Sequence, residues 1–304
     1  MATSLSIVIP SYARADLLAL CLKSATRFAP SDTEILVVDD ASKNELISKT
    51  ALGFGGVRVV RLPKRSGFCI AANAGVRIAT GEIVELLNDD AEVTANWAEV
   101  ALRWFEDPSI AAVSPLVLQH GSAGLIDTAG DEYDRGGFAR KRGHGVVWHE
   151  GRFPAGPIWG VSAAAGFYRR SAFHEVGGFP ESFGAYFEDV DLAFRLRKVG
   201  YRAWFDPECV VHHRVSASYG QRPGRRTLVQ QSCNEERVFW RNRSPGNLSR
   251  HLAVLGGKFL RRVDEGTAAP WIAGRARAWM EQARDCMEVR SELRSKSVHG
   301  APTG

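Results

Sequence analysis

Three acidic segments of the chain have the residue types and spacing for chemistry on phosphates and hydroxyl groups. Asn88-Asp89-Asp90 follows the apolar run of residues 82–87, and adjacent carboxylates at a strand end can hold Mg²⁺ or Mn²⁺ beside substrate phosphates. Asp39-Asp40 ends a second apolar run in the same way, so these carboxylates can accept hydrogen bonds from a base or a ribose. Glu188-Asp189-Val190-Asp191 opens a predicted helix, where a carboxylate near a substrate hydroxyl would act as a general base.

Each of these segments also has a purely structural interpretation. Asp and Asn are common turn residues, so Asn88–Asp90 alone is more typical of a solvated turn that caps the next helix. Asp40 or Ser42 can cap a helix, and the acids of residues 188–191 can do the same. His212-His213 follows a predicted strand and can ligate a metal or contact a phosphate, although such a pair is more often structural.

Strands and helices alternate along the first 115 residues. Alternation of this kind predicts βαβ units, and therefore an α/β fold with a mostly parallel central sheet and helices on both faces. Ligands of such sheets bind at the carboxyl ends of the strands, where the paired carboxylates are expected to lie. The predicted strands are residues 5–9, 34–38, 57–60, 82–87 and 110–113, and the predicted helices are residues 17–22, 70–78 and 97–105.

The remainder of the chain has a weaker pattern. Residues 120–160 contain ten glycines and are predicted to be a long loop, which closes over a site or lies on the surface. A helix is predicted over residues 167–176, another from Glu188 to Val199, and a strand over residues 201–211. Beyond residue 220 the pattern is basic and mostly helical.

Composition limits the class of protein. The 304 residues are 45% hydrophobic and 24% charged, which excludes disorder and collagen-like repeats. Residues 221–304 hold 16 Lys and Arg against 8 Asp and Glu, whereas the first 220 residues hold 23 against 26. An acidic-to-neutral body argues against nucleic acid as a partner, and a basic tail is compatible with an anionic surface such as a membrane.

The cysteines and the apolar runs indicate a compartment. Five scattered cysteines without a CxxC pair favour neither a disulfide framework nor a zinc ribbon, so a reducing environment is expected. Residues 4–10 are too short and lack the basic start of a signal peptide, and no apolar run is long enough to span a bilayer. We therefore expect a cytoplasmic protein, with peripheral contact to the inner face of the plasma membrane through its tail.

Taken in chain order, seven motifs resemble those of the family 2 inverting glycosyltransferases with the GT-A fold, especially bacterial rhamnosyltransferase-like members. The resemblance covers residues 4–220, and the order of the motifs is far more specific than any one of them. The motifs are Ser6–Tyr12, Ile35–Ser42, Gly67–Gly75, Leu86–Asp90, Ala165–Arg170, Val176–Phe179, and Phe187–Leu192 with Arg195 and Gly200-Tyr201.

The resemblance implies a role for each matching residue. Asp90 matches the last Asp of the DxD-type motif that binds a divalent cation, Mn²⁺ or Mg²⁺, and Asp189 matches the catalytic base. His213, or alternatively His212, matches the histidine that closes over the diphosphate or the metal. On the donor side the resemblance places Pro10 and Tyr12 at the nucleotide and Asp40 at the nucleobase, with Asp39 beside it. It places Arg65, Gly67 and Asn73 along the nucleotide and diphosphate, and Asp89 next to the donor sugar.

Two further residues are expected on the acceptor side. Trp159 precedes the Ala165–Arg170 motif, and an aromatic face can stack on a sugar, although each aromatic taken singly is more often a core residue. Glu188 adjoins the expected base. One departure from the family pattern is Asn88, which stands at the first position of the DxD triplet and puts the metal affinity in question.

The implied activity is metal-dependent, inverting transfer of a sugar from a UDP- or dTDP-linked donor, with rhamnose or another deoxysugar favoured. The acceptor is a hydroxyl of a glycan, a glycolipid or a small molecule. The implied domains are a GT-A catalytic domain of residues 1–220, with a donor half (1–115) and an acceptor half (116–220), and a basic helical extension of residues 221–304.

Other functions are less consistent with the sequence. A sugar-1-phosphate nucleotidyltransferase needs a glycine-rich loop after the first strand, and a dinucleotide-dependent oxidoreductase needs GxGxxG there, but Pro10–Arg14 contains no glycine. A degenerate carbohydrate- or membrane-binding relative would lack the carboxylates at Asp90 and Asp189, and both are present. Residues 251–262 are interpreted as a membrane-interfacial segment that reaches a lipid-linked acceptor, as a helix packed on the catalytic domain, or as a homodimer contact.

Overall fold

A computed structural model of the chain describes residues 3–214, 223–242 and 246–282. The chain divides into two compact units. The first unit, called the N-terminal unit below, comprises Met1–Asp134 and Ala139–Arg222, and the second, called the C-terminal unit, comprises Arg135–Phe138 and Pro223–Gly304.

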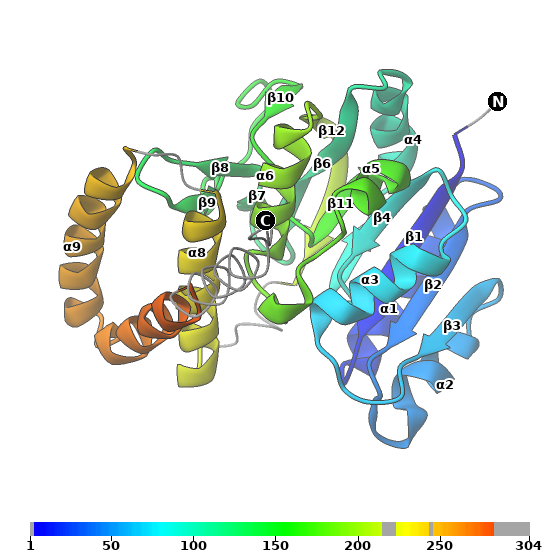
Figure 1. Cartoon of the computed structure of the whole chain (residues 1–304). Helices are drawn as coiled ribbons and strands as arrows, with labels where there is room; N and C mark the ends of the chain where they lie inside the picture. Colours follow the sequence, from blue (N-terminus) through cyan, green and yellow to red (C-terminus); the bar gives the residue numbers. More distant parts are fainter. Residues whose placement is uncertain (1–2, 215–222, 243–245, 283–304) are drawn as a thin grey trace, which may run out of the picture. The chain divides into compact units, whose positions relative to one another are not determined.

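The first part of the N-terminal unit is the predicted parallel α/β sheet (Figure 1). Four strands lie in the order β4-β1-β2-β3, and each neighbouring pair is parallel. The strands and helices alternate as the sequence predicted, which confirms the fold class. They are β1 (Leu5–Ser11), α1 (Ala15–Phe28), β2 (Glu34–Asp39), α2 (Leu46–Leu52), β3 (Val57–Arg61), α3 (Phe68–Ile78) and β4 (Ile83–Leu87).

The sheet continues into the second part of the unit through an antiparallel strand. β11 (Ala165–Arg169) pairs antiparallel with both β4 and β6, whereas β6 and β12 pair parallel to each other. The other elements here are β5 (Ala91–Val93), α4 (Trp97–Leu102), β6 (Ile110–Gln119), β10 (Gly156–Ile158), α5 (Arg170–Glu175), α6 (Glu188–Lys198) and β12 (Arg202–His213).

Two predictions for the second part were wrong. The glycine-rich residues 120–160 are not one long loop, because they form short strands, among them β7 (Ile126–Thr128), β8 (Asp131–Tyr133) and β9 (Ala139–Lys141). Strands of three residues are too short for an alternating pattern to emerge. Residues 167–169 belong to the strand β11 and not to a helix. The prediction failed because β11 is buried and apolar on both faces, so its sequence lacks the alternating pattern of a half-buried strand.

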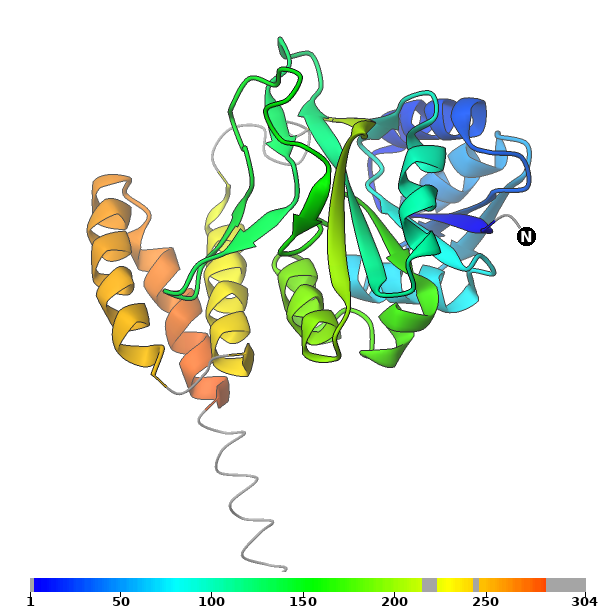
Figure 2. The same cartoon turned by 90° about the horizontal axis from the view of Figure 1, so that it is seen from above.

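Helices cover both faces of the sheet (Figures 1 and 2). On β1, Ile7 and Ile9 pack in one core with α1, α2 and α4, while Val8 faces the opposite side. There α3 approaches so closely that a Cβ on Gly75 would lie 2.3 Å from a methyl group of Val8. Glycine at this position lets α3 lie flat on the sheet, and α3 and its flanking loops then border the carboxyl ends of β1 and β2.

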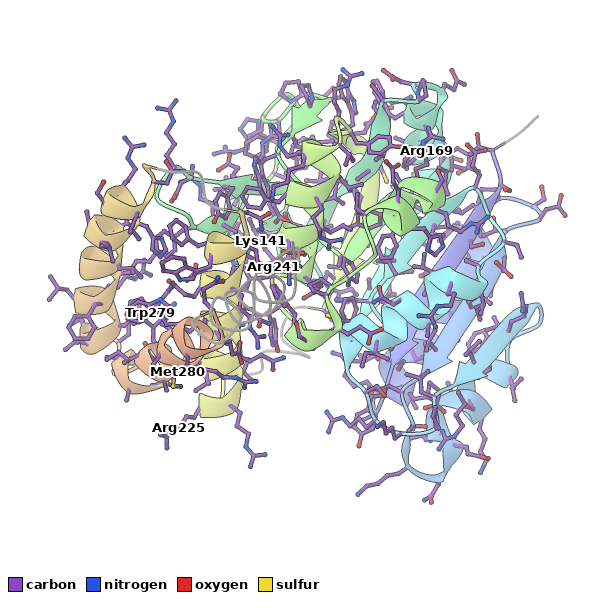
Figure 3. The ribbon with its side chains drawn as sticks, in the orientation of Figure 1. Lys141, Arg169, Arg225, Arg241, Trp279 and Met280 are labelled. Carbon is purple, nitrogen blue, oxygen red and sulfur yellow. The ribbon has the colours of Figure 1, made fainter. Side chains whose placement is uncertain are left out.

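The C-terminal unit is built from helices around a small core. Its elements are α8 (Arg225–Asn242), α9 (Leu248–Asp264) and a helix over residues 268–282. The buried Glu236 carboxylate accepts hydrogen bonds from Trp240 and from Trp279, which is labelled in Figure 3, and pairs with Arg275 and His251. Phe138, in the turn that follows β8, packs in the same unit against Leu255 and Trp271.

The described residues can be compared with the expectations about disulfide bonds and membrane-spanning segments. Cys21, Cys69, Cys209 and Cys233 are buried free thiols, and Cys286 lies outside the described residues. Within the described parts of the chain, no helix combines the length and apolar character that crossing a bilayer would take.

Glu85 gives the fold a predictable pH dependence. It is fully buried in β4, and burial raises its pKa to about 8 although Trp97 Nε1 donates to both carboxylate oxygens, at 3.0 and 3.2 Å. The unfolded chain loses this proton near the ordinary glutamate pKa, so between these two pH values the unfolded state binds fewer protons and stability falls as pH rises. We expect Glu85→Gln to match the wild type near pH 4 and to exceed its unfolding free energy by about 5 kcal/mol above pH 9.

Urea unfolding followed by circular dichroism at a series of pH values measures this difference. Parallel stability curves for the two proteins would contradict a raised Glu85 pKa.

Candidate active site

The loops after β1 and β4 bring two carboxylates and a guanidinium together, because these parallel strands end at the same edge of the sheet. Ser11 Oγ donates to Asp89 at 2.6 Å, and Arg14 pairs with Asp89 and, at 2.6 Å, with Asp90. Both carboxylates are buried. Burial raises the pKa of Asp89 to about 6, although Arg14 and Ser11 act to lower it. Arg14 therefore neutralises part of the charge that two buried carboxylates would otherwise carry.

His213 joins Asp90 to a third carboxylate. Its Nε2 lies 3.0 Å from Asp90 Oδ1, and its Nδ1 lies 2.9 Å from Oδ2 of Asp127 on β7. Because side chains alternate along β12, His212 lies on the opposite face, where its ring contacts that of His120 edge to face. Of the two histidines named from the sequence, the structure therefore brings His213 to Asp90.

Asp127 is held ionised by the cations around it. Lys141, which projects from β9 and is labelled in Figure 3, lies 2.8 and 2.9 Å from its two carboxylate oxygens. Burial would raise the pKa of Asp127, but hydrogen bonds with His144 and His213 and the charge of Lys141 hold it well below the ordinary value. Burial alone would lower the pKa of His213, and its hydrogen bonds with Asp127 and Asp90 outweigh that effect and raise it.

Asp90 and His213 have the donor chemistry of a divalent cation site. A carboxylate oxygen and an imidazole nitrogen face each other, and the second ring nitrogen is bound by a carboxylate, as is usual for metal-ligating histidines. Two protein ligands suffice for Mg²⁺ or Mn²⁺ when substrate phosphates and water supply the rest. Across the described ranges, no three His, Cys, Asp or Glu side chains are grouped as a metal site. The residues fit a cation that binds together with a diphosphate, and the cation stays a prediction.

Four of the predicted donor residues, Tyr12, Asp40, Arg65 and Gly67, lie in or near the loops after β1 and β2. The Arg65 guanidinium lies 4.1 Å from the centre of the Tyr12 ring. The Asp40 carboxylate accepts hydrogen bonds from the backbone amides of Ser66 and Gly67, at 2.6 and 2.9 Å. Gly67 has φ +90°, a conformation that L side chains rarely adopt. This arrangement places an aromatic ring, a cation and a carboxylate beside the carboxyl end of the sheet.

The other predicted donor residues are engaged within the protein. The Asp39 carboxylate accepts hydrogen bonds from Ser42, Ser48 and Arg61 and so fixes the turn after β2. The Asn73 amide exchanges two hydrogen bonds of 2.9 Å with the backbone of Phe179. Pro10 is buried within β1. The donor contacts of these three residues remain predictions, while their positions give each a structural role.

Asp189, the expected base, lies in the first turn of α6. Its Oδ2 accepts from the amide of Ala163 at 3.0 Å, and its Oδ1 from that of Val190 at 2.8 Å. Burial raises its pKa, and these two hydrogen bonds act against the increase. Tyr186 and Phe187, just before α6, both have positive φ, a strained backbone that is typical of functional sites. The carboxylate is therefore fixed in direction and more basic than an exposed aspartate.

Two buried carboxylates accompany Asp189. Glu188 and Asp131 are each 5% exposed, and one oxygen of each, Oε2 and Oδ2, has no hydrogen-bond partner among the described residues. Burial raises the pKa of Asp131 well above the ordinary value, and the charge of Asp189 raises it further. The same two causes, in the same order, raise the pKa of Glu188.

One backbone segment and one lysine connect the Asp90 group with the Asp189 group. In the segment of residues 160–164, the carbonyl of Ala164 accepts from the Asn88 amide at 2.9 Å, while the amide of Ala163 donates to Asp189. Lys141 stands directly opposite Asp131 in the β8–β9 pair, and its charge lowers the pKa of both Asp131 and Asp189. The fold therefore places the expected metal residues and the expected base in one electrostatic environment.

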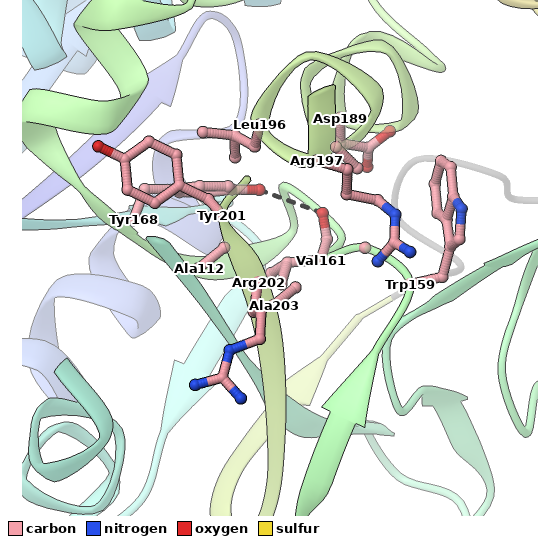
Figure 4. Close-up of a pocket in the computed structure, with 12 residues that line it drawn as sticks. Ala112, Trp159, Val161, Tyr168, Asp189, Leu196, Arg197, Tyr201, Arg202 and Ala203 are labelled. Carbon is pink, nitrogen blue, oxygen red and sulfur yellow. Dashed lines mark hydrogen bonds between the residues drawn. The ribbon is translucent and has the colours of Figure 1, made fainter. Parts of the chain in front are cut away.

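Trp159 lies in an aromatic cluster beside the base. Its ring stacks on Tyr133 at 5.2 Å, and Phe194 meets it edge to face. Trp159 and Asp189 both line a small cavity, shown in Figure 4, in which Tyr168 donates a hydrogen bond to the carbonyl of Val161. The half-buried Trp159 therefore lies near the Asp189 carboxylate.

Four residues of this site were missed in the sequence analysis. Arg14, Asp127, Asp131 and Lys141 are charged residues without a motif of their own. Asp127 and Asp131 flank a Thr-Ala-Gly sequence within the stretch that was predicted to be a loop. Two aspartates that flank this short Thr-Ala-Gly sequence were the available signal.

Comparison with known proteins gives a family, several relatives and structural neighbours. A model of the family described as Glycosyl transferase family 2 matches residues 6–177. The chain is 30% identical over 184 residues to the pre-mycofactocin glycosyltransferase of Mycobacterium tuberculosis, which covers 59% of this chain and 37% of that protein. It is 26% identical over 248 residues to the N-acetylglucosaminyl-diphospho-decaprenol L-rhamnosyltransferase of the same species, covering 73% and 80%. The chain spans 27 to 37% of the length of three of its curated relatives.

Two solved structures have a similar fold at 20% sequence identity. GalNAc-T7 with UDP, GalNAc and Mn²⁺ aligns with a TM-score of 0.59 over 70% of this chain and 43% of that chain. The mannosyltransferase PcManGT from Pyrobaculum calidifontis, in complex with GDP-Man and Mn²⁺, aligns with a TM-score of 0.56 over 96% and 81%. These similarities confirm the predicted GT-A fold.

Proposed function

The chain belongs to glycosyl transferase family 2 and is a glycosyltransferase, and on this premise we propose that it transfers a sugar with inversion to a hydroxyl held beside Asp189. The observation that carries the proposal is the meeting of two groups. Asp90 and His213 face each other at 3.0 Å, and Lys141, paired with Asp127 beside them, also acts electrostatically on Asp189. One centre thus combines residues for a diphosphate with a fixed base.

Asp189 takes the proton from the acceptor hydroxyl in this proposal. Its two backbone hydrogen bonds fix the direction of the carboxylate, and its raised pKa makes it a stronger base toward an alcohol. The acceptor oxygen attacks the anomeric carbon from the face opposite the nucleotide, and the bond to the diphosphate breaks. A single displacement needs one protein base, because a diphosphate leaving group requires no protonation. The two-carboxylate arrangement of glycoside hydrolysis is therefore unnecessary.

The donor diphosphate is proposed to lie near Asp90, His213 and Arg14. A divalent cation bound there supplies charge neutralisation to the departing diphosphate. Arg14 already pairs with Asp89 and Asp90 and adds positive charge close to the same position. Tyr12 and Arg65 provide an aromatic and cationic surface for the nucleobase of the donor, and the Asp40 carboxylate lies beside them.

Donor and acceptor identity are proposed from the resemblance and from the relatives' names. A uridine or thymidine diphosphate sugar is the proposed donor, with rhamnose or another deoxysugar as the transferred group, in line with the L-rhamnosyltransferase relative. A glycan or glycolipid hydroxyl is the proposed acceptor. Membrane contact and dimerisation through the C-terminal unit stay predictions. The α9 side chains Leu252, Leu260 and Val263 are more than half exposed, as such contacts would require.

A thermal-shift panel tests the donor site. We expect UDP or dTDP together with Mn²⁺ or Mg²⁺ to raise the melting temperature of the full chain, and EDTA to remove most of the shift, because a ligand that binds only the native state stabilises it. GDP serves as the nucleotide control. No shift with any nucleotide and any metal would favour a degenerate binding protein and overturn the proposal.

We expect Asp127 to influence metal binding through its hydrogen bond with His213. Replacing it with asparagine removes the charge that fixes the His213 ring, so we expect the Mn²⁺ affinity in the presence of nucleotide to fall about tenfold to a hundredfold. Electron paramagnetic resonance of free Mn²⁺ measures this affinity. Asp206→Asn, which alters another buried carboxylate paired with Arg103, is the matched control. Equal Mn²⁺ affinity in both variants would contradict this role.

A further inference from the structure

The buried His251, in the first turn of α9, has a hydrogen-bond acceptor at each nitrogen of its ring. Its Nδ1 lies 2.7 Å from the carbonyl oxygen of Gly136, and its Nε2 lies 3.2 and 3.3 Å from the two carboxylate oxygens of Glu236. A neutral imidazole has one N–H and serves only one such acceptor. A ring that donates to both is an imidazolium, so His251 brings a positive charge into the core of the C-terminal unit.

Glu236 is the counter-ion of this charge. Burial would raise the pKa of Glu236, but the hydrogen bond from His251 and the charge of Arg275 hold it below the ordinary value, so the carboxylate is ionised and can only accept. The other charged groups here share a different carboxylate, since both Lys258 and Arg275 pair with Glu235. Nε2 of His251 therefore has to carry a proton, as Nδ1 does.

Two phenyl rings and a glycine join His251 to the turn of residues 135–138. The imidazole ring stacks on Phe239 with 3.6 Å between ring centres and on Phe138 with 5.1 Å. An aromatic face attracts a cation, so both stacks favour the imidazolium. A Cβ on Gly137 would lie 2.5 Å from the Phe239 ring and 2.8 Å from His251 Nδ1. The absence of a side chain at Gly137 therefore lets the turn lie against His251.

The same turn connects β8 to β9, which form a two-stranded sheet of their own. Tyr133 pairs with Ala139 next to the turn, and Asp131 pairs with Lys141 at the opposite end of this hairpin. A hairpin of two strands is at best marginally stable by itself, so contacts at its turn contribute to its order. Because the charge of Lys141 lowers the pKa of Asp189, the order of the hairpin affects the proposed base.

Building on the proposed function, we propose that His251, held as an imidazolium by Glu236, is a positioning residue for the catalytic centre. It binds the carbonyl of Gly136 and so fixes the β8–β9 hairpin, which keeps Lys141 paired with Asp127. The C-terminal unit thereby takes part in the reaction through one turn of the chain. The sequence analysis gave His251 no role in the reaction.

Hydrogen–deuterium exchange of the full chain tests this role without requiring activity. Glutamine in place of His251 carries no charge, so the turn loses its cationic donor. We expect the amides of residues 131–142 to exchange about tenfold faster or more in His251→Gln than in the wild type. Ser232→Ala is the matched control, because it removes a buried 2.6 Å hydrogen bond to the carbonyl of Trp271 in the same unit and leaves the turn unchanged. Equal exchange over residues 131–142 in the two variants would overturn the proposal.

A second pair of variants keeps the test valid if His251→Gln does not fold. Gly137→Ala displaces the turn while His251 stays in place, because the new Cβ meets the two rings. Gly246→Ala has a similar backbone strain, with φ +94° against +91° at Gly137, but no described atom lies within 4 Å of its Cβ position. Faster hairpin exchange is expected in Gly137→Ala alone, and the same exchange in both variants would contradict the proposal.

The pH profile of kcat is a readout that loss of stability alone would not move. With Lys141 displaced, the pKa of Asp189 rises, so the acid limb should move to higher pH by about half a unit in His251→Gln and stay in place in Ser232→Ala. In a Lys141→Met background, His251→Gln should cause no further shift. An unmoved acid limb, or an equal shift in that background, would overturn the link to the reaction. The charged side chains that interact with Asp189 include Lys141, Glu188 and Asp131.

NMR of the chain labelled with [¹⁵N]histidine reports the charge of His251 directly. At neutral pH both ring nitrogens should have the chemical shift of an N–H group, and a nitrogen with a free lone pair would overturn the imidazolium. Neither this spectrum nor hydrogen exchange depends on a substrate. If the wild type transfers no sugar, the proposed function fails, and the two measurements still decide whether His251 holds the hairpin.

Discussion

Replacing Asp189 with asparagine is expected to lower kcat about a thousandfold while the KM for the nucleotide sugar stays within a few-fold of the wild type. Asparagine keeps the size of the side chain and one acceptor oxygen for the amide of Ala163, but it cannot take a proton from the acceptor hydroxyl. Initial rates of nucleoside diphosphate release, measured with a saturating glycoside acceptor, give both constants.

The pH profile supplies a second readout for Asp189. Because burial raises its pKa, wild-type kcat should fall on the acid side at a pH above the ordinary range of aspartate, as the base becomes protonated. This acid limb should be absent from the residual activity of Asp189→Asn. Asp191→Asn is the matched control in the same helical turn. Its carboxylate pairs with Arg195 at 2.8 Å, so we expect reduced stability with kcat retained. A variant with wild-type kcat at position 189 would remove Asp189 from the mechanism.

The second large effect is expected at Asp90. Asparagine there leaves one neutral oxygen where the buried carboxylate now faces His213 and Arg14, so a divalent cation loses its anionic ligand. We expect kcat/KM to fall about a thousandfold or more, since the charge on the departing diphosphate is no longer neutralised. The metal-dependent part of the thermal shift with UDP or dTDP should disappear with it.

Two comparisons distinguish loss of the metal from general damage. Asp206→Asn removes a buried ion-paired carboxylate outside this cluster and should retain the metal-dependent shift. The metal-independent part of nucleotide binding, measured in EDTA, should be similar in Asp90→Asn and the wild type. If Asp90→Asn keeps a metal-dependent shift of full size, another residue holds the cation, and the role proposed for Asp90 is wrong.

The predictions for Asp90 and Asp189 place different demands on the surrounding structure. When a cation and a diphosphate bind, the contacts of Asp90 with His213 and Arg14 must rearrange. Both partners are side chains and can form new contacts. Asp189 needs a fixed direction, and it is held by two backbone amides. Lys141 acts on both residues. It pairs with Asp127, which in turn binds His213 next to Asp90, and its charge lowers the pKa of Asp189. A change in Lys141 should therefore affect metal binding and the pH profile together.

The sequence by itself determined the parallel half of the fold and the loops that follow its strands. The buried strands β1, β2 and β4 appear as continuous apolar runs between helical patterns, and this local signal is strong because both faces of a parallel sheet are covered. The carboxyl ends of parallel strands meet at one edge. The chain order of the motifs therefore sufficed to place Asp89 and Asp90 there and to identify the family.

Only the tertiary structure decided which side chains complete the site. Asp127, Asp131 and Lys141 lie in strands of three residues, which are too short for a local period to reveal them. The choice between His212 and His213 depends on which face of β12 packs toward Asp90, and a shift of one residue in register would exchange them. Spacing in the sequence gives residue types and strand ends. Register and burial decide which of those residues share a proton, a metal or an acceptor.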